Sequence, residues 1–228
     1  MKPMKINIAI DGHSSCGKGT LAKYLANHFG YKFIDTGAMY RAITFALQEE
    51  NIELSDKDAI KTLLAANKVT FKYSEEKGAL ECFYLSKNID FEIRLPAVSS
   101  LVSQASEIDV IRQNLVEQQR FLAKENGVVM DGRDIGSYVL PKAELKIFMT
   151  AAPEIRAKRR YNELTKANID VPYEQILENV RFRDKNDSNR AINPLIKAND
   201  AKVLDNSNLS IDEQNAIALA WANEVLTH

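Results

Sequence analysis

The sequence predicts an α/β fold in which helices cover a mainly parallel sheet. Apolar runs of strand length alternate with longer stretches of helical spacing, and a glycine-rich loop follows the first such run. Residues 68–93 break this alternation with two or three strand-like runs, which predicts a small antiparallel insert on the core. The chain has 228 residues, so we expect one domain over residues 1–228.

Composition narrows the class of protein before any motif is considered. The chain has 30 Lys and Arg residues and 31 Asp and Glu residues, so its formal net charge is −1. A charge near zero argues against a nucleic-acid-binding protein. Two cysteines are too few for a disulfide framework, which favours a reducing compartment. The run INIAI is too short for a signal peptide, and no run reaches membrane length. We therefore expect a cytoplasmic protein without a membrane or nucleic-acid partner. We also expect a monomer, although composition does not bear on the oligomeric state.

The N-terminal elements follow the order strand, glycine loop, helix, strand, helix. Residues 5–11 are apolar and β-branched, as in a strand buried on both faces, and they end at Gly12. Residues 21–29 have helical spacing and stop at Gly30, residues 31–35 form a second short strand, and Thr36 is expected to cap a helix over 37–51.

The remaining elements continue the alternation. Further strands are predicted at 127–131, 144–149 and 202–205. Helices are predicted near 106–126, 153–167, 172–191 and 210–226.

The glycine loop has the spacing G-x-x-x-x-G-K of a phosphate-binding loop. Its backbone N–H groups can surround an anion, the following helix offers its positive end, and the lysine reaches the outer phosphates. The alternative is a glycine-rich turn without a ligand, but a strand before and a helix behind are both present. The expected phosphate-binding residues are Gly12, His13, Ser14, Ser15, Cys16, Gly17, Lys18, Gly19 and Thr20.

Thr20 and Cys16 are the two residues of this loop whose positions affect the expected chemistry. The common pattern places Ser or Thr directly after the lysine, whereas here Gly19 intervenes and Thr20 follows. Thr20 is therefore expected to contact phosphate and is one candidate magnesium ligand. We expect no covalent chemistry at Cys16, because a loop filled by phosphate leaves no place for an activating base.

Arginines gather on two predicted helices. Arg156, Arg159 and Arg160 follow i, i+3, i+4 spacing, and Arg183, Asp187 and Arg190 follow i, i+4, i+7 spacing, so each set shares one helix face. The alternative is solvated faces with weak ion pairs. The phosphate loop favours the functional interpretation, since phosphoryl transfer commonly employs arginines.

The segment Asp131-Gly132-Arg133-Asp134 directly follows a predicted strand. Ligands of open α/β sheets bind at the carboxyl ends of strands, so Arg133 and Asp134 are expected to face the ligand. Asp131 is a second candidate for magnesium binding, through a bound water. The alternative is a plain turn with exposed charges.

Five segments, in this order, resemble the bacterial cytidylate kinase family of nucleoside monophosphate kinases: GHSSCGKGT, FIDTGAMYR, VVMDGRDIG, IRAKRR and RDKNDSNRAINPL. The resemblance spans almost the whole chain, and the combination is far more specific than the glycine loop alone. It implies a P-loop kinase with a parallel five-stranded sheet wrapped by helices. It further implies a monophosphate-binding insert over 65–105 and a lid over 153–170.

The resemblance also implies residue roles. Residues 12–20 would hold the ATP phosphates, and Arg156, Arg159 and Arg160 would close over the transferring phosphoryl group. The acceptor phosphate would meet Arg41, Arg133 and Arg190, the sugar Arg183 and Asp187, and the cytosine Ser103, Arg112 and Asp134. Thr36 stands where relatives frequently have serine. The implied catalytic set is Lys18, Arg133, Arg156, Arg159, Arg160 and Arg190.

The implied reaction is transfer of the γ-phosphoryl group of ATP to CMP and dCMP with Mg²⁺. The acceptor phosphate is already an anion, so no general base is needed. The Asp134 carboxylate can accept a hydrogen bond from the amino group of cytosine. Uracil has a carbonyl oxygen at this position, which has no hydrogen to donate. Two alternatives remain: a P-loop kinase for another small molecule, and a nucleotide-dependent switch, although the guanine-reading motif N-K-x-D is absent.

Overall fold

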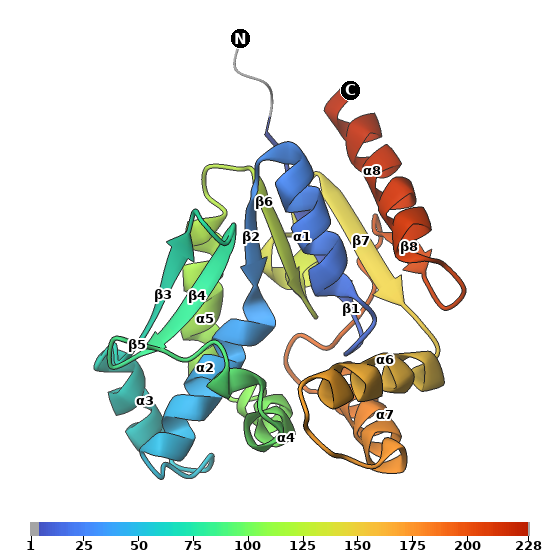
Figure 1. Ribbon diagram of the computed structural model, residues 1–228. Helices are drawn as coiled ribbons and strands as arrows, with labels where there is room; N and C mark the ends of the chain where they lie inside the picture. Colours follow the sequence, from blue (N-terminus) through green and yellow to red (C-terminus); the bar gives the residue numbers. More distant parts are fainter. Residues whose placement is uncertain (1–4, 228) are drawn as a thin grey trace.

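A computed structural model describes residues 5–227 and shows one central sheet with helices on both faces (Figure 1). Within that range the sheet has eight strands, in the order β3-β4-β2-β6-β1-β7-β8, with β5 paired to β4. Its parallel centre consists of β2 (Lys32–Asp35), β6 (Val128–Gly132), β1 (Asn7–Gly12), β7 (Leu145–Thr150) and β8 (Lys202–Asp205). The predicted parallel five-stranded sheet is confirmed.

The central strand β1 is buried along its whole length, as its apolar sequence predicts. Successive side chains point to opposite faces: Ile8 and Ile10 join one core cluster, and Ala9 joins the other. The register aligns Asp11 with Gly132 of β6 and Asp35 of β2 with Asp131 of β6. Polar residues at three strand ends therefore meet at one edge of the sheet.

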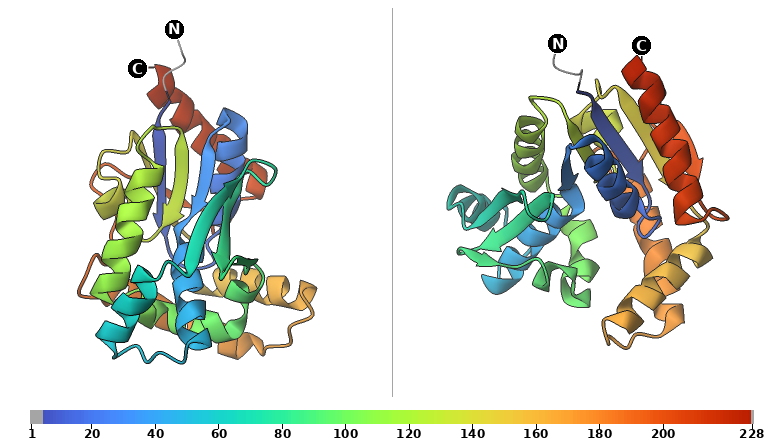
Figure 2. Two further views of the ribbon diagram at one scale, coloured as in Figure 1. Left: turned by 90° about the vertical axis from the view of Figure 1, so that its left-hand side faces the viewer. Right: turned by 45° about the horizontal axis from the view of Figure 1, so that its top comes forward.

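Two helices cover each face of the sheet. On one face α1 (Lys18–Phe29) and α8 (Ile211–Thr227) pack on the cluster that contains Ile8 and Ile10. On the other, α2 (Thr36–Glu49) and α5 (Asp109–Leu122) pack on the cluster that contains Ala9. The side view in Figure 2 shows α1 and α5 on opposite sides of the strands. No helix among residues 5–227 has both the length and the apolar character needed to cross a bilayer.

The helix α2 begins one residue earlier than a Thr36 cap requires, so that prediction is wrong. Asp35 is the N-cap, and its Oδ1 accepts a hydrogen bond from the Ala38 N–H at 2.8 Å. Thr36 is the first helical residue, and its Oγ1 donates to the Asp131 carbonyl oxygen at 2.7 Å. Both residue types cap helices, and the carboxylate takes the position here.

The antiparallel insert continues the main sheet at its edge and is not a separate layer. It consists of β3 (Val69–Ser74), β4 (Ala79–Tyr84) and β5 (Lys87–Asn88). Its β4 pairs in parallel with β2 through Ala79 and Phe33. Two helices that we did not predict flank it: α3 (Lys57–Ala65) before β3, and α4 (Pro96–Ala105) after the short turn η1 (Glu92–Arg94).

The predicted helices at 153–167 and 172–191 are α6 (Pro153–Lys166) and α7 (Tyr173–Asn189). They share a small apolar cluster of their own, made by Ala157, Leu164, Ile176 and Val180. They lie beyond the carboxyl ends of β1 and β7 (Figure 1). The predicted lid, 153–170, covers α6 and part of the loop to α7.

Candidate active site

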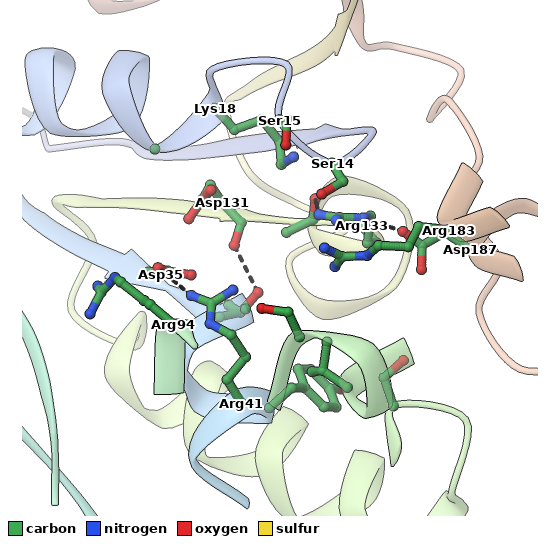
Figure 3. A pocket seen from close by; sticks show the side chains of 18 of the residues that line it. Ser14, Ser15, Lys18, Asp35, Arg41, Arg94, Asp131, Arg133, Arg183 and Asp187 are labelled. Atoms are coloured by element: carbon green, nitrogen blue, oxygen red, sulfur yellow. Dashed lines mark hydrogen bonds and ion pairs between the residues drawn. The ribbon is translucent and has the colours of Figure 1, made fainter. Parts of the chain in front are cut away.

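A cavity of about 450 Å³ opens at the carboxyl ends of the central strands. It lies between the glycine loop on one side and α2, α4 and α7 on the other (Figure 3). Eight Lys and Arg side chains line it against five of Asp and Glu, so the cavity favours an anionic ligand. The basic residues are Lys18, Lys23, Arg41, Arg94, Arg133, Arg160, Arg183 and Arg190; the acidic residues are Asp35, Asp131, Asp134, Glu163 and Asp187.

The glycine loop leaves β1 through a position that only glycine can occupy. Gly12 has φ +152°, and a Cβ atom there would lie 2.0 Å from the Met149 carbonyl oxygen. Gly17, with φ +94°, precedes α1, which begins at Lys18. The N-terminal end of α1 therefore points into the cavity, as anion binding requires.

Six of the nine predicted loop residues line the cavity: Ser14, Ser15, Gly17, Lys18, Gly19 and Thr20. Gly12, His13 and Cys16 do not, and the Cys16 side chain is fully buried. Lys18 is only 5% exposed, and its Nζ donates to the His13 carbonyl oxygen at 2.7 Å. Burial, and secondly the charge of Arg133, lower the pKa of Lys18.

The predicted acceptor-side arginines converge on the cavity from three segments. Arg41 on α2 pairs with Asp35 at 3.0 Å, and Arg133 after β6 pairs with Asp187 on α7 at 2.6 Å. Arg190 caps the end of α7. Arg183 also lines the cavity, and burial, with the charge of Arg133, lowers its pKa to about 10. These cations crowd one another, which is costly until an anion binds.

Around Asp134 the structure buries several polar atoms that lack a hydrogen-bond partner. Asp134 forms an ion pair with Arg112, and its Oδ1 lies 3.4 Å from Arg190 Nη2. Ser103 Oγ and Arg112 Nε are buried without hydrogen-bond partners. Arg112 itself does not line the cavity, and its guanidinium lies 5.7 Å from the centre of the Tyr40 ring, which does. Such buried polar atoms are suited to a polar, flat ligand.

Two carboxylates stand side by side where β2 and β6 end. Burial, and secondly the charge of Asp35, raise the pKa of Asp131 to about 7. Asp131 Oδ1 has no hydrogen-bond partner, whereas Asp35 is held by Arg41 and the Ala38 N–H. Thr20 is exposed in the same cavity. Residues 5–227 contain no cluster of three or more His, Cys, Asp or Glu side chains placed to hold a metal ion.

The three arginines of α6 lie in three different environments. Arg160 lines the cavity and pairs with Glu163 at 2.8 Å. Arg156 is 2% exposed and lies outside the cavity lining, bound by Asp184 through bonds of 2.8 and 2.6 Å. Arg159 binds Asn206 at 3.0 and 2.9 Å. A role for Arg156 and Arg159 at the phosphoryl group stays a prediction, because it requires these contacts to rearrange.

Sequence reasoning missed several residues of the site. Asp184 lies outside the cavity but binds Arg156 from α7, and a contact between two helices leaves no spacing signal in the sequence. Asp35 and Tyr40 lie within the motif FIDTGAMYR but carried no separate signal. Arg94 comes from η1, for which the sequence showed no pattern. All other predicted substrate-binding residues except Arg112 line the cavity: Thr36, Arg41, Ser103, Arg133, Asp134, Arg183, Asp187 and Arg190.

Comparison with solved structures supports the fold. The chain is similar to a shikimate kinase from Bacteroides thetaiotaomicron, with a TM-score of 0.50 and 12% identity over 99% of this chain and 100% of that chain. It is also similar to an uncharacterized protein from Eubacterium ventriosum, with a TM-score of 0.54 and 14% identity over 97% and 99%. Identities this low show only a shared fold.

Comparison of sequences is more specific. The cytidylate kinase family model matches residues 8–224. A cytidylate kinase from Flavobacterium psychrophilum is 50% identical over 224 residues, which is 97% of this chain and 99% of that protein. Another, from Bacteroides thetaiotaomicron, is 49% identical over 223 residues, 96% of each. With the P-loop and the arginine cluster facing one cavity, these matches show that the chain belongs to the cytidylate kinase family.

Proposed function

We propose that this protein transfers the γ-phosphoryl group of ATP to CMP, producing ADP and CDP. The observation that carries the proposal is that a phosphate-binding loop and a cluster of arginines face each other across one cavity. Two polyanions would be brought together there with their phosphates adjacent, and membership of the cytidylate kinase family supports their identity.

The donor would bind at the N-terminal end of α1. The backbone N–H groups of residues 12–20 and the helix dipole would hold the ATP phosphates, with Lys18 Nζ reaching the outer ones. In the structure Lys18 Nζ already lies at the loop, bound to the His13 carbonyl oxygen at 2.7 Å. It would exchange this neutral acceptor for a phosphate oxygen.

The acceptor would bind between α2, the Asp131–Asp134 segment and α7. Arg41, Arg133 and Arg190 would hold its phosphate, because guanidinium groups match phosphate oxygens in pairs. Arg183 and Asp187 would contact the sugar hydroxyls. Although burial alone would raise the pKa of Asp187, Arg133 and Arg183 hold it below its ordinary value, so Asp187 stays ionised and accepts hydrogen bonds.

The base would be recognised by Asp134, Ser103 and Arg112. Asp134 would accept a hydrogen bond from the amino group at position 4 of cytosine. Uracil carries a carbonyl oxygen there, which would leave two acceptors face to face and unpaired. The proposed acceptors are therefore CMP and dCMP, which share this base.

Transfer would proceed by in-line attack of an acceptor phosphate oxygen on the γ-phosphorus of ATP. The bond between the γ-phosphorus and the oxygen that bridges to the β-phosphate would break, and ADP would leave with that oxygen. The nucleophile is already an anion, so positioning and charge neutralisation by Lys18, Arg133 and Arg160 carry the catalysis. Mg²⁺, when bound, would neutralise the donor phosphates. The unpartnered Asp131 Oδ1 and the Thr20 hydroxyl fit it, because Mg²⁺ prefers oxygen ligands and keeps several waters.

The predicted lid would complete the site. Residues 153–170 carry Arg160 into the cavity, and their closure over both nucleotides would exclude water that could otherwise hydrolyse ATP. We also propose that the protein works as a monomer. Since both nucleotides are cytoplasmic metabolites, we also propose that the protein works in the cytoplasm.

The test is ADP formation from ATP and Mg²⁺ with CMP, dCMP, UMP, AMP and GMP offered one at a time, and with no acceptor as control. We expect CMP and dCMP to be used best and UMP at least about tenfold less efficiently. If AMP or GMP were the best acceptor, the base assignment would be wrong. If no monophosphate increased ADP formation above the control, the proposed activity itself would be wrong.

A further inference from the structure

Asp11 is a buried carboxylate that does not line the cavity. It stands directly before Gly12, at the end of β1, and is 5% exposed. Its two oxygens accept two backbone hydrogen bonds at 2.7 Å each: Oδ1 from the Ile135 N–H and Oδ2 from the Gly136 N–H. Each carboxylate oxygen is therefore used by a segment 124 or 125 residues away in the chain.

These two N–H groups begin η2 (Ile135–Val139), a single helical turn that follows Asp134. The first N–H groups of any helical turn lack partners within the turn, and capping side chains usually supply them from a nearby residue. Here Asp134 provides no side-chain cap. Asp11 supplies the cap from the neighbouring strand, which its register opposite Gly132 makes possible.

Asp134 is consequently held between two fixed points of the backbone. On one side, Gly132 belongs to the ladder between β6 and β1. On the other, Asp11 fixes the next two residues, Ile135 and Gly136. The Asp134 side chain is also pulled by Arg112 and Arg190. The position of the Asp134 carboxylate therefore depends both on these ion pairs and on the backbone that Asp11 holds.

Gly136 shows how closely this contact is packed. A Cβ atom at Gly136 would lie 3.3 Å from Asp11 Oδ2 and 3.1 Å from the Lys146 side chain. The other charged groups near Asp11 are Asp134 and Lys18. Burial raises the pKa of Asp11 to about 6, although the two N–H bonds oppose this, so the group is an ionised acceptor at pH 8.

We propose that Asp11 is a positioning residue for base recognition. By holding the backbone of Ile135 and Gly136, it places the Asp134 carboxylate where it can accept a hydrogen bond from the cytosine amino group. This inference rests on the proposed function of Asp134. Because both hydrogen bonds of the Asp11 side chain go to η2, we expect its replacement to affect the acceptor more than ATP.

The decisive variant is Asp11→Asn, assayed at pH 8 with CMP, UMP and ATP varied separately. The amide oxygen can accept one N–H, but the amide nitrogen faces the other, so one bond is lost. We expect the ratio of kcat/KM for CMP to that for UMP to fall about tenfold, with the KM for ATP changed less than about twofold. A purely structural role would lower the melting temperature and leave this ratio unchanged, and that result would overturn the inference.

A matched control is Asp56→Asn. Asp56 also accepts a backbone N–H at the start of a helix, from Ala59 at 2.9 Å, but lies at α3 outside the cavity. We expect the selectivity of this variant to equal that of the unmodified protein. A loss of selectivity equal to that of Asp11→Asn would overturn the inference.

Gly136→Ala provides a second test if Asp11→Asn fails to fold, because the added methyl group crowds Asp11 and leaves its charge in place. It too should lower the ratio, and an unchanged ratio would overturn the inference.

The same assay separates this inference from the proposed function. If the unmodified protein itself does not prefer CMP to UMP, the role proposed for Asp134 is wrong, and this inference fails with it. If the unmodified protein prefers CMP and Asp11→Asn keeps the preference, only the role of Asp11 is wrong.

Discussion

Lys18 is the residue whose removal should damage transfer most and folding least. Its ammonium group is buried, and burial lowers its pKa, so alanine removes an unfavourable buried charge. We expect Lys18→Ala to lower kcat by about 100- to 1000-fold and leave the melting temperature equal or higher. Steady-state kinetics and thermal unfolding measure the two effects.

The control for Lys18 is Lys61→Ala, which removes an exposed lysine of α3. It should leave both kcat and the melting temperature unchanged within error. Full activity of Lys18→Ala would show that this lysine does not neutralise the transferring group.

Asp131 should make folding stability depend on pH. Its pKa is about 7 in the folded protein, raised by burial and by Asp35, and the ordinary value is 3.8. The unfolded chain therefore loses this proton more readily, and stability falls as the pH rises from about 4 to about 7. Asp131→Asn removes the effect, so the variant should gain about 2 kcal/mol more at pH 8 than at pH 5, relative to the unmodified protein.

Denaturant unfolding at both pH values tests this expectation. Asp58→Asn is the control, because the Asp58 side chain is 93% exposed. Its effect on the free energy of unfolding should be the same at pH 5 and pH 8. An Asp131→Asn gain that is equal at both pH values would contradict the raised pKa.

The pair of helices α6 and α7 offers two ion pairs of very different burial. Arg156, 2% exposed, is held by Asp184, and Arg181, with a side chain 61% exposed, pairs with Glu154 at 2.8 Å. Removing Asp184 leaves a buried guanidinium unpaired, whereas removing Arg181 leaves an exposed carboxylate. We expect Asp184→Ala to cost about 3 kcal/mol of unfolding free energy and Arg181→Ala less than about 1 kcal/mol.

Equal costs for these two variants would show that burial does not distinguish the pairs. The expected difference also bears on the predicted lid, because Arg156 donates to the Ser14 carbonyl oxygen at 3.3 Å. This hydrogen bond joins α6 to the glycine loop one helical turn before Arg160.

The parallel strands and their helices were predictable because hydrophobic periodicity is strong where elements are buried. β8 was predicted at its observed bounds, 202–205. α4 was not predicted, since its serines and valines favour a helix only weakly, and its one clear signal is Pro96 at the first turn. The cap of α2 was assigned one residue late, because Asp35 and Thr36 are both capping types.

Within the site, local sequence predicted residues but not their partners. The i, i+3, i+4 spacing identified Arg156, Arg159 and Arg160 as one face of a helix. Only the folded chain shows that Asp184 and Asn206 bind two of them, because those contacts span 28 and 47 residues. Long-range pairing of this kind leaves no periodic pattern in the sequence.

The molecule as a whole brings two groups of cavity-lining elements together at the carboxyl edge of one sheet. The glycine loop and α1 form one group; the ends of β2 and β6 with β4, α2, α4 and α7 form the other. The cavity carries more cations than anions, so nucleotide binding should stabilise the fold.

Thermal unfolding with added nucleotide measures this stabilisation. CMP at 100 times its Kd should stabilise the protein by about 2.7 kcal/mol, and UMP at the same concentration by less. A non-hydrolysable ATP analogue should add to the effect of CMP. Equal shifts with CMP, UMP and inorganic phosphate would show that the cavity binds any phosphate and reads no base.

The most direct test follows the transferred group itself. The protein is incubated with ATP labelled at the γ-phosphate, CMP and Mg²⁺, and the products are separated. We expect the label to appear in CDP, in an amount equal to the ADP formed. Label released only as inorganic phosphate, with CMP unchanged, would contradict the claim that two nucleotides meet phosphate to phosphate in this cavity.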